Sequence, residues 1–133
     1  MAVSSQLRGG KMISTRSELK DIVKELKTSG ILDAAAIIRR DGILLASNFP
    51  PHIMKKEVFG MMSATIIGAA KNITEKTGMG KPTKIIIETN EGNLIFAGAG
   101  LKALLVCLIK EKKYSPELFE AIEAARLKVE ELL

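Results

Sequence analysis

The stretch KIIIETNEGNLIFAGAGLKALLVCLI, residues 84–109, decides the fold. Three runs of β-branched and other apolar residues alternate in it with two short glycine-containing turns, a pattern typical of consecutive antiparallel strands. The last run, residues 103–109, is almost entirely apolar, as expected of a central strand that is covered on both faces. These residues therefore predict three successive strands, the last of which lies inside a sheet.

A hairpin is predicted upstream of this stretch. Its two β-prone runs, residues 34–38 and 43–46, flank the sequence Arg-Asp-Gly at positions 40–42. Asp-Gly is a preferred pair for a tight type I′ turn, so we expect Asp41 and Gly42 at the centre of the turn. Three consecutive alanines in the first run leave little side-chain bulk, which suits a central strand with helices packed closely against it.

Three amphipathic helices are predicted around these strands. The first follows a capping box at Thr15 and Glu18, in which a hydroxyl and a glutamate satisfy free backbone amides. The last follows the hydroxyl cap Ser115 and runs to the C-terminus. Between them, residues 55–77 form the longest helix, which Gly78 ends. The predicted order is α-ββ-α-βββ-α, an α/β chain of the α+β type.

The length of 133 residues corresponds to one domain. Residues 1–13 contain two adjacent glycines and little apolar content, and we expect a mobile basic tail there, before a domain at residues 14–133. The net charge of +5 comes mainly from this end and from scattered lysines. Nucleic-acid binding usually needs clustered basic residues with aromatic rings for stacking, and the chain has one Tyr, four Phe and no Trp. We therefore expect no nucleic-acid partner.

Membrane and secretory signals are missing from the sequence. No run reaches the roughly 18 apolar residues of a membrane span, and the first residues lack the apolar core of a signal peptide. A single cysteine, Cys107, excludes an internal disulfide and a site with several thiolates. We expect a cytoplasmic protein without stable membrane insertion.

Two glycine-containing motifs could suggest nucleotide binding. Gly98-x-Gly100 follows a predicted strand, as in a dinucleotide-binding fingerprint, but the required helix, second strand and acidic residue do not follow. A hairpin turn is the favoured interpretation. Residues 78–81 are similar to a phosphate-binding loop, but Glu75 and Pro82 stand where that loop requires Gly and Ser or Thr. A loop at the end of a helix is favoured there.

The sequence contains no recognisable set of catalytic residues. His52 is the only histidine and has no cysteine or second histidine to complete a zinc site. Cys107 lies inside an apolar strand, where a small buried hydrophobic residue is expected. We therefore predict no catalytic, cofactor-binding or metal site, and an interaction module rather than an enzyme.

The long helix carries more apolar surface than one sheet can bury. The first of two adjacent stripes comprises Val58, Met61, Met62, Thr65, Ile66, Ala69 and Ile73. The second comprises Phe59, Ser63, Ile67, Ala70 and Thr74. We expect the first stripe to face the sheet and the second to contact a partner, with Phe59, Ser63, Ile67 and Ala70 at the contact. In the strand at residues 84–89, Ile85, Ile86 and Ile87 run without charge, so at a sheet edge they would invite another strand.

The order of the elements and three stretches resemble the roadblock family, the dynein light chain-like and prokaryotic GTPase-regulator domains. Residues 31–47 are similar to the family's first hairpin, residues 91–95 to the turn between its third and fourth strands, and residues 98–109 to its final hairpin. The resemblance covers residues 16–133. It implies a profilin-like fold, with the long helix on one face of the sheet and the terminal helices on the other.

The resemblance also implies a function. Roadblock domains typically form homodimers by joining their third strands edge to edge and packing their long helices together, and prokaryotic members often act beside small Ras-like GTPases. We therefore expect a non-enzymatic homodimeric regulator or scaffold that binds such a GTPase, with no cofactor. The alternatives are an adaptor dimer that recruits another protein without a GTPase, and a nucleotide-using enzyme through Gly98 and Gly100. An arginine finger at Arg39 or Arg40 is conceivable, although adjacent arginines beside a hairpin turn are more often solvated.

Overall fold

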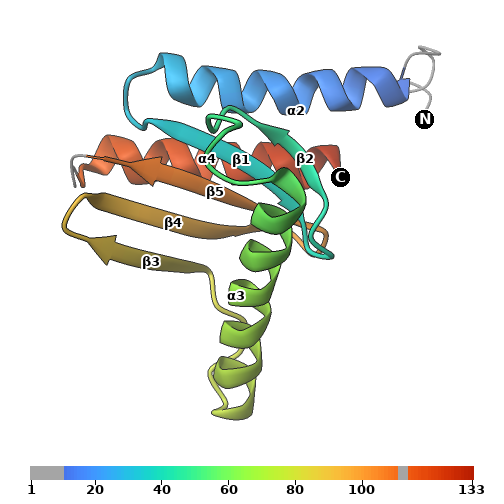
Figure 1. Ribbon diagram of the computed structural model, residues 1–133. Helices are drawn as coiled ribbons and strands as arrows, with labels where there is room; N and C mark the ends of the chain where they lie inside the picture. Colours follow the sequence, from blue (N-terminus) through green and yellow to red (C-terminus); the bar gives the residue numbers. More distant parts are fainter. Residues whose placement is uncertain (1–10, 111–113) are drawn as a thin grey trace.

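The computed structural model describes residues 11–110 and 114–133, in which five antiparallel strands form one sheet between helices (Figure 1). The long helix α3 lies on one face of the sheet, and α2 and α4 lie on the other (Figure 1). In chain order, the elements are α2 (Lys11–Thr28), β1 (Ala34–Arg39), β2 (Leu44–Ser47), α3 (Lys56–Lys76), β3 (Lys84–Thr89), β4 (Gly92–Ala99), β5 (Ala103–Ile109) and α4 (Pro116–Leu132). The predicted fold class and the order α-ββ-α-βββ-α are confirmed.

The strands lie in the order β2-β1-β5-β4-β3. β5 occupies the centre, and its residues from Ala103 to Cys107 are fully buried, as the apolar run predicts. The alanines of β1 are also buried, between β2 and β5 and beneath helices on both faces. Small side chains in this strand therefore allow close packing from both sides.

We name the two sides of the sheet after their helices. The α4 face carries α2 and α4 and contains the larger core, with Leu19 and Val23 of α2 packed near Leu118, Ile122 and Val129 of α4. The hydroxyl of Ser115 accepts a hydrogen bond from the Leu118 amide at 3.1 Å, which confirms the predicted cap of α4.

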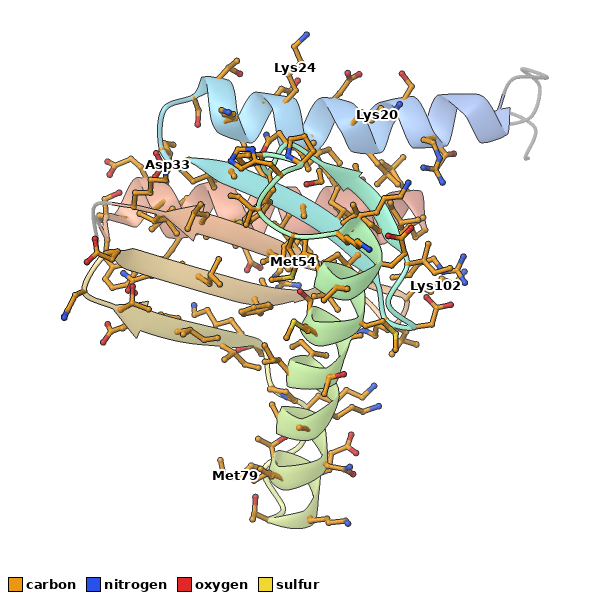
Figure 2. All side chains as sticks on the ribbon, viewed as in Figure 1. Lys20, Lys24, Asp33, Met54, Met79 and Lys102 are labelled. Carbon is orange, nitrogen blue, oxygen red and sulfur yellow. The ribbon has the colours of Figure 1, made fainter. Side chains whose placement is uncertain are left out.

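The α3 face is only partly covered. α3 lies over β1 and β2 and then extends past the rest of the sheet, so that Met79 lies far from the strands (Figures 1 and 2). The crossing at Gly60 is very close, because a Cβ there would lie 1.9 Å from the carbonyl oxygen of Gly42 in the β1–β2 turn. Glycine at position 60 is therefore required for the backbones to approach in this way.

The start of the first helix differs from the prediction. α2 includes Lys11, four residues before the predicted cap, so Thr15 lies inside the helix and the capping box is wrong. The sequence from Lys11 onward contains no Gly or Pro that would stop the helix from continuing toward the N-terminus. Residues 11–13 of the predicted tail are therefore helical, and residues 1–10 lie outside the described residues.

The turn between β1 and β2 also differs. The Gly42 amide donates to the Arg39 carbonyl at 2.9 Å, so Arg40 and Asp41 lie at the centre of the turn. Gly42 follows them with a φ of +99°. This is a three-residue loop with a glycine in the bulge position, and the predicted type I′ turn centred on Asp41 and Gly42 is wrong.

Candidate interaction surfaces

The outward side of α3 is strongly apolar. Met61 is 61% exposed and Ile73 is 65% exposed, and Val58 and Met62 beside them are also exposed. We call these four residues the α3 stripe. In the sequence they belong to the stripe that was expected to face the sheet, and that assignment is wrong.

The side of α3 that faces the sheet carries the second set of residues. Ser63 is 2% exposed and Ile67 is 3% exposed, and both lie beneath the helix. Phe59 is half-buried and packs against Phe49 with 4.8 Å between the ring centroids, and Ala70 is also half-buried. The physical reason is the close crossing at Gly60, which fixes the side of the helix that meets the sheet, and Ser63 and Ile67 lie along that same side. Ser63 and Ile67 are therefore not accessible on the surface of the single chain.

The two edges of the sheet are different. β2 is four residues long, and the Leu45 carbonyl accepts a hydrogen bond from the Arg16 guanidinium at 3.3 Å. β3 is six residues long, and β4 is the one described strand that pairs with it, along its whole length. Its position at an edge, on which the expectation for Ile85, Ile86 and Ile87 depended, is confirmed.

The isoleucines of β3 point to both sides of the sheet. Ile85 and Ile87 are partly buried against the core of the α3 face, whereas Ile86 alternates to the other face and is 38% exposed. The outer row of backbone groups on β3 has no strand beside it among the described residues. Such an edge is a template for pairing with another strand.

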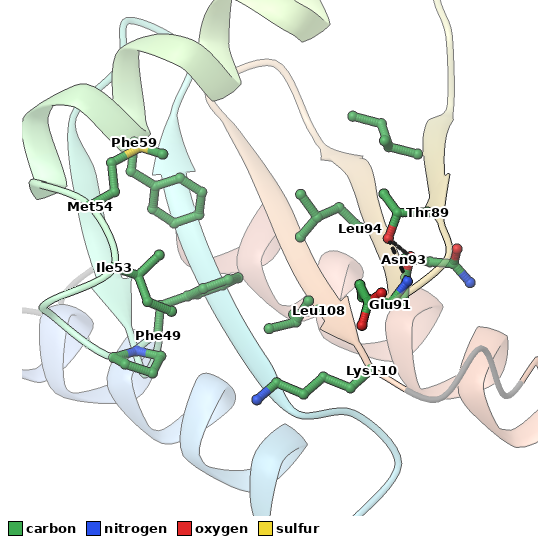
Figure 3. A pocket seen from close by; sticks show the side chains of 13 residues that line it. Phe49, Ile53, Met54, Phe59, Thr89, Glu91, Asn93, Leu94, Leu108 and Lys110 are labelled. Atoms are coloured by element: carbon green, nitrogen blue, oxygen red, sulfur yellow. Dashed lines mark hydrogen bonds between the residues drawn. The ribbon is translucent and has the colours of Figure 1, made fainter.

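An apolar groove of about 600 Å³ opens on the α3 face, between the loop before α3 and the β3–β4 turn (Figure 3). Its walls are formed mainly by Phe49, Ile53, Phe59, Leu94 and Leu108, and its charged lining residues are Glu91 and Lys110. Four separate segments of the chain contribute to the groove, so no local sequence pattern predicts it.

Neither Cys107 nor His52 lies in a setting that supports catalysis or metal binding. Cys107 is fully buried, and burial raises the pKa of its thiol to about 12, so the thiolate is not formed at neutral pH. His52 is exposed in the loop before α3. The described residues contain no group of three His, Cys, Asp or Glu side chains placed to hold a metal ion.

The two arginines of the β1–β2 turn have separate local roles. Arg39 is exposed and forms an ion pair with Asp41, and this hydrogen bond lowers the pKa of Asp41. Arg40 is half-buried, and its Nη2 donates to the Gly100 carbonyl at 2.7 Å. Gly100 has a φ of +76° in the β4–β5 turn, which confirms the hairpin interpretation of the Gly98-x-Gly100 motif. Arg40 therefore folds back onto its own sheet.

Comparison with known proteins identifies the family. Residues 18–109 match the Roadblock/LC7 domain. The chain belongs to the Roadblock/LC7 family. Protein MJ0310 of Methanocaldococcus jannaschii is 31% identical over 86 residues, which cover 65% of this chain and 73% of that protein. Protein MJ0714 of the same organism is 25% identical over 96 residues, which cover 72% and 80%.

Solved structures share the fold of this Roadblock/LC7 domain. MglB of Myxococcus xanthus has a TM-score of 0.81 at 12% identity and covers 88% of each chain. The gliding protein MglB of Thermus thermophilus has a TM-score of 0.77 at 16% identity, over 89% of this chain and 90% of that one. Profilin IA of Acanthamoeba castellanii has a TM-score of 0.62 at 17% identity, over 84% and 96%. The profilin-like fold is thus confirmed.

The Roadblock/LC7 family is one of regulatory and adaptor domains, which is consistent with a regulatory or scaffold role. Within the part of the chain that the structure describes, no helix is both long and apolar enough to cross a membrane.

Proposed function

We propose that this Roadblock/LC7 domain is a homodimeric, non-enzymatic regulator or scaffold that binds a small Ras-like GTPase in the cytoplasm. The observation that carries the proposal is the exposed α3 stripe, which lies on the same molecule as an unpaired β3 edge. Contiguous apolar surface on a globular domain usually marks an interaction site.

The dimer follows from the geometry of the β3 edge. If β3 pairs antiparallel with its own copy, the twofold axis is perpendicular to the sheet, and both α3 helices lie on the same face. The second half of α3, to which Ile73 belongs, extends beyond the strands and therefore toward the copy (Figure 1). Pairing then satisfies the outer backbone groups of β3, with Ile85, Ile86 and Ile87 at the junction, and buries part of the α3 stripe. A solved structure described as MglB with tetrameric arrangement shows self-assembly in a protein of this fold.

Family membership supports the GTPase as the partner, because prokaryotic roadblock domains often act beside small Ras-like GTPases. The role would be activation or scaffolding. Arg40 is engaged with Gly100 in this structure, so an activator that used Arg40 as a finger would first have to release that hydrogen bond.

The experiment has two steps. The purified chain is used to capture Ras-like proteins from the native cell extract, and the captured GTPase is then purified and loaded with GTP or GDP. Faster GTP hydrolysis identifies an activator, and binding without acceleration identifies a scaffold. Lys24→Glu on the outer side of α2 serves as a surface control and should bind normally (Figure 2). Failure of every Ras-like GTPase of that cell to bind the chain contradicts the GTPase partner.

An adaptor dimer that recruits another protein without a GTPase is the second candidate. The apolar groove favours it, because such a groove can hold apolar side chains of a partner irrespective of a nucleotide state. Leu94→Asp at the groove would then abolish capture of that partner while Lys24→Glu leaves it intact. A partner that binds both variants equally does not use the groove.

A further inference from the structure

A second cavity, of about 310 Å³, lies at the end of the sheet where the β1–β2 and β4–β5 turns meet. Figure 2 shows this end at Lys102, in the β4–β5 turn. The lining comes from both turns, from α3, from the loop that follows it and from α4. The lining residues are Arg40, Lys71, Lys81, Pro82, Thr83, Gly98, Gly100, Leu101, Arg126 and Glu130.

The charges around this cavity are strongly unbalanced. Four lining side chains are cationic, and Glu130 is the single carboxylate among the lining residues. Arg126 is already neutralised, because it forms a bidentate ion pair with Glu123 at 2.6 and 2.8 Å. No ion pair joins Arg40, Lys71 or Lys81 to a carboxylate of the described residues. With Arg126 paired and Glu130 offsetting one of the three other cations, the cavity keeps an excess of about two positive charges.

Arg40 is the cation of the cavity that most clearly lacks an anionic partner among the described residues. Its Nη2 donates to the neutral carbonyl of Gly100, and its Nε is buried with no hydrogen-bond partner among the described residues. A guanidinium is seldom withdrawn from water without an anion beside it, because desolvation of a charge is costly. Burial accordingly lowers the pKa of Arg40.

Gly98 leaves room beside this guanidinium. A Cβ at position 98 would lie 3.0 Å from Arg40 Nη2, closer than ordinary van der Waals contact. The lining contains no aromatic ring that could stack on a nucleobase. The space and the charge therefore suit a compact anion better than a nucleotide.

We propose that this cavity binds a phosphate monoester, with Arg40 as the inner contact and Lys71 and Lys81 as the outer positive charges. A monoester carries between one and two negative charges at neutral pH, which matches the excess positive charge of the cavity. Arginine presents a planar set of donors that fits phosphate oxygens, and lysine adds a mobile point charge. The phosphate belongs either to a small soluble molecule or to a lipid headgroup.

Calorimetry and vesicle flotation with the full chain separate these two sources. Glycerol 3-phosphate is the soluble probe, with glycerol as its uncharged control. Phosphatidylcholine vesicles with and without phosphatidylinositol 4-phosphate are the lipid probe. Saturable binding to either probe, and not to its control, is the expected result.

Variants then locate the binding. Lys71→Gln with Lys81→Gln removes two cavity charges, and Lys56→Gln with Lys76→Gln removes two exposed charges of α3 that do not line the cavity. The cavity pair should weaken binding about a hundredfold, since each of the two lost charge-assisted hydrogen bonds carries about a factor of ten. The control pair should bind like the wild type, and both should melt at the wild-type temperature. Absence of saturable binding to both probes, or equal losses in the two pairs, would overturn the proposal.

Discussion

The two faces of the sheet are built in opposite ways. On the α4 face, α2 and α4 lie side by side and enclose nineteen buried residues with the strands, counted over the described residues. On the α3 face, one described helix covers part of the sheet, and the core there has six buried residues, of which Ile67 belongs to the helix and five to the strands. The helix with the most apolar outward surface is also on this second face.

The difference separates stability from recognition. A core that is closed by two helices stabilises the domain on its own, because its apolar side chains are removed from water within one chain. The α3 face leaves apolar side chains in water, which lowers solubility unless another molecule covers them. We infer that the α4 face maintains the fold and that the α3 face meets partners.

The largest expected effect comes from Ile67, the buried residue of α3. Ile67→Asp places a carboxylate in the apolar core beneath the helix and should destabilise the domain by on the order of 4 kcal/mol. Urea unfolding followed by circular dichroism measures this. The variant is therefore unsuitable as a probe of dimerisation, although the sequence pattern placed Ile67 at the expected contact with a partner. A stably folded Ile67→Asp would mean that α3 can leave the sheet without loss of the fold.

The next effect tests the α4 face. Leu118 is fully buried against that core, so Leu118→Ala should cost about 3 kcal/mol in the free energy of unfolding through lost burial and a residual cavity. Leu127→Ala on the same helix removes an exposed side chain and should change stability by less than about 0.5 kcal/mol. Denaturant midpoints give both values. Equal losses in the two variants would contradict the one-sided burial of α4.

A third experiment tests the α3 face with a substitution that should leave the fold intact. Ile73→Asp should leave the secondary structure intact and shift the particle mass from twice the chain mass toward 14.4 kDa, because a charge then enters the proposed helix contact. Light scattering at micromolar concentration shows the change. Leu127→Asp makes the same exchange on the outside of α4 and should remain dimeric. A wild type that is monomeric removes the proposed dimer, and a dimeric Ile73→Asp removes this part of α3 from the interface.

The smallest effect is expected from the ion pair at the β1–β2 turn. The hydrogen bond from Arg39 lowers the pKa of Asp41, so its contribution to stability is present above the ordinary pKa of aspartate and disappears as the pH falls through the lowered value. Both side chains are exposed, and water screens their interaction. Asp41→Asn should therefore melt slightly below the wild type at neutral pH and together with it in strong acid. A gap that persists in acid would trace the effect to the turn geometry.

Local sequence patterns were sufficient for most of the fold. The apolar run of β5 predicted a central strand, Ser115 predicted the cap of α4, and the Gly98-x-Gly100 motif was correctly interpreted as a hairpin. These features depend on neighbours that are close in the chain. The first turn of α2 was missed because the capping pattern at Thr15 also fits the interior of a helix.

The surfaces were harder to predict, for a physical reason. Periodicity shows that α3 has two apolar stripes. A stripe that binds a partner has the same residue composition as one that faces the core, so periodicity does not tell them apart. The useful signal was the small residues Gly60 and Ser63, which mark the side of closest approach. The second cavity joins residues as distant as Arg40 and Arg126, so only the folded chain brings its charges together.

The crossing of Gly60 over Gly42 is a point about which α3 can tilt. The helix is held at the β1–β2 turn, where Gly60 touches Gly42, and by Ser63 and Ile67 beneath it, and no described strand lies beneath its far end (Figure 1). From Gly60 to Lys76 the helix measures about 24 Å, so a tilt of about 5° at the pivot displaces the far end by about 2 Å. At the pivot the backbone of Gly60 approaches the Gly42 carbonyl directly, because neither residue has a side chain between them. A small tilt of the helix at the turn would therefore produce a larger displacement at the far end of α3, near Ile73 and Met79.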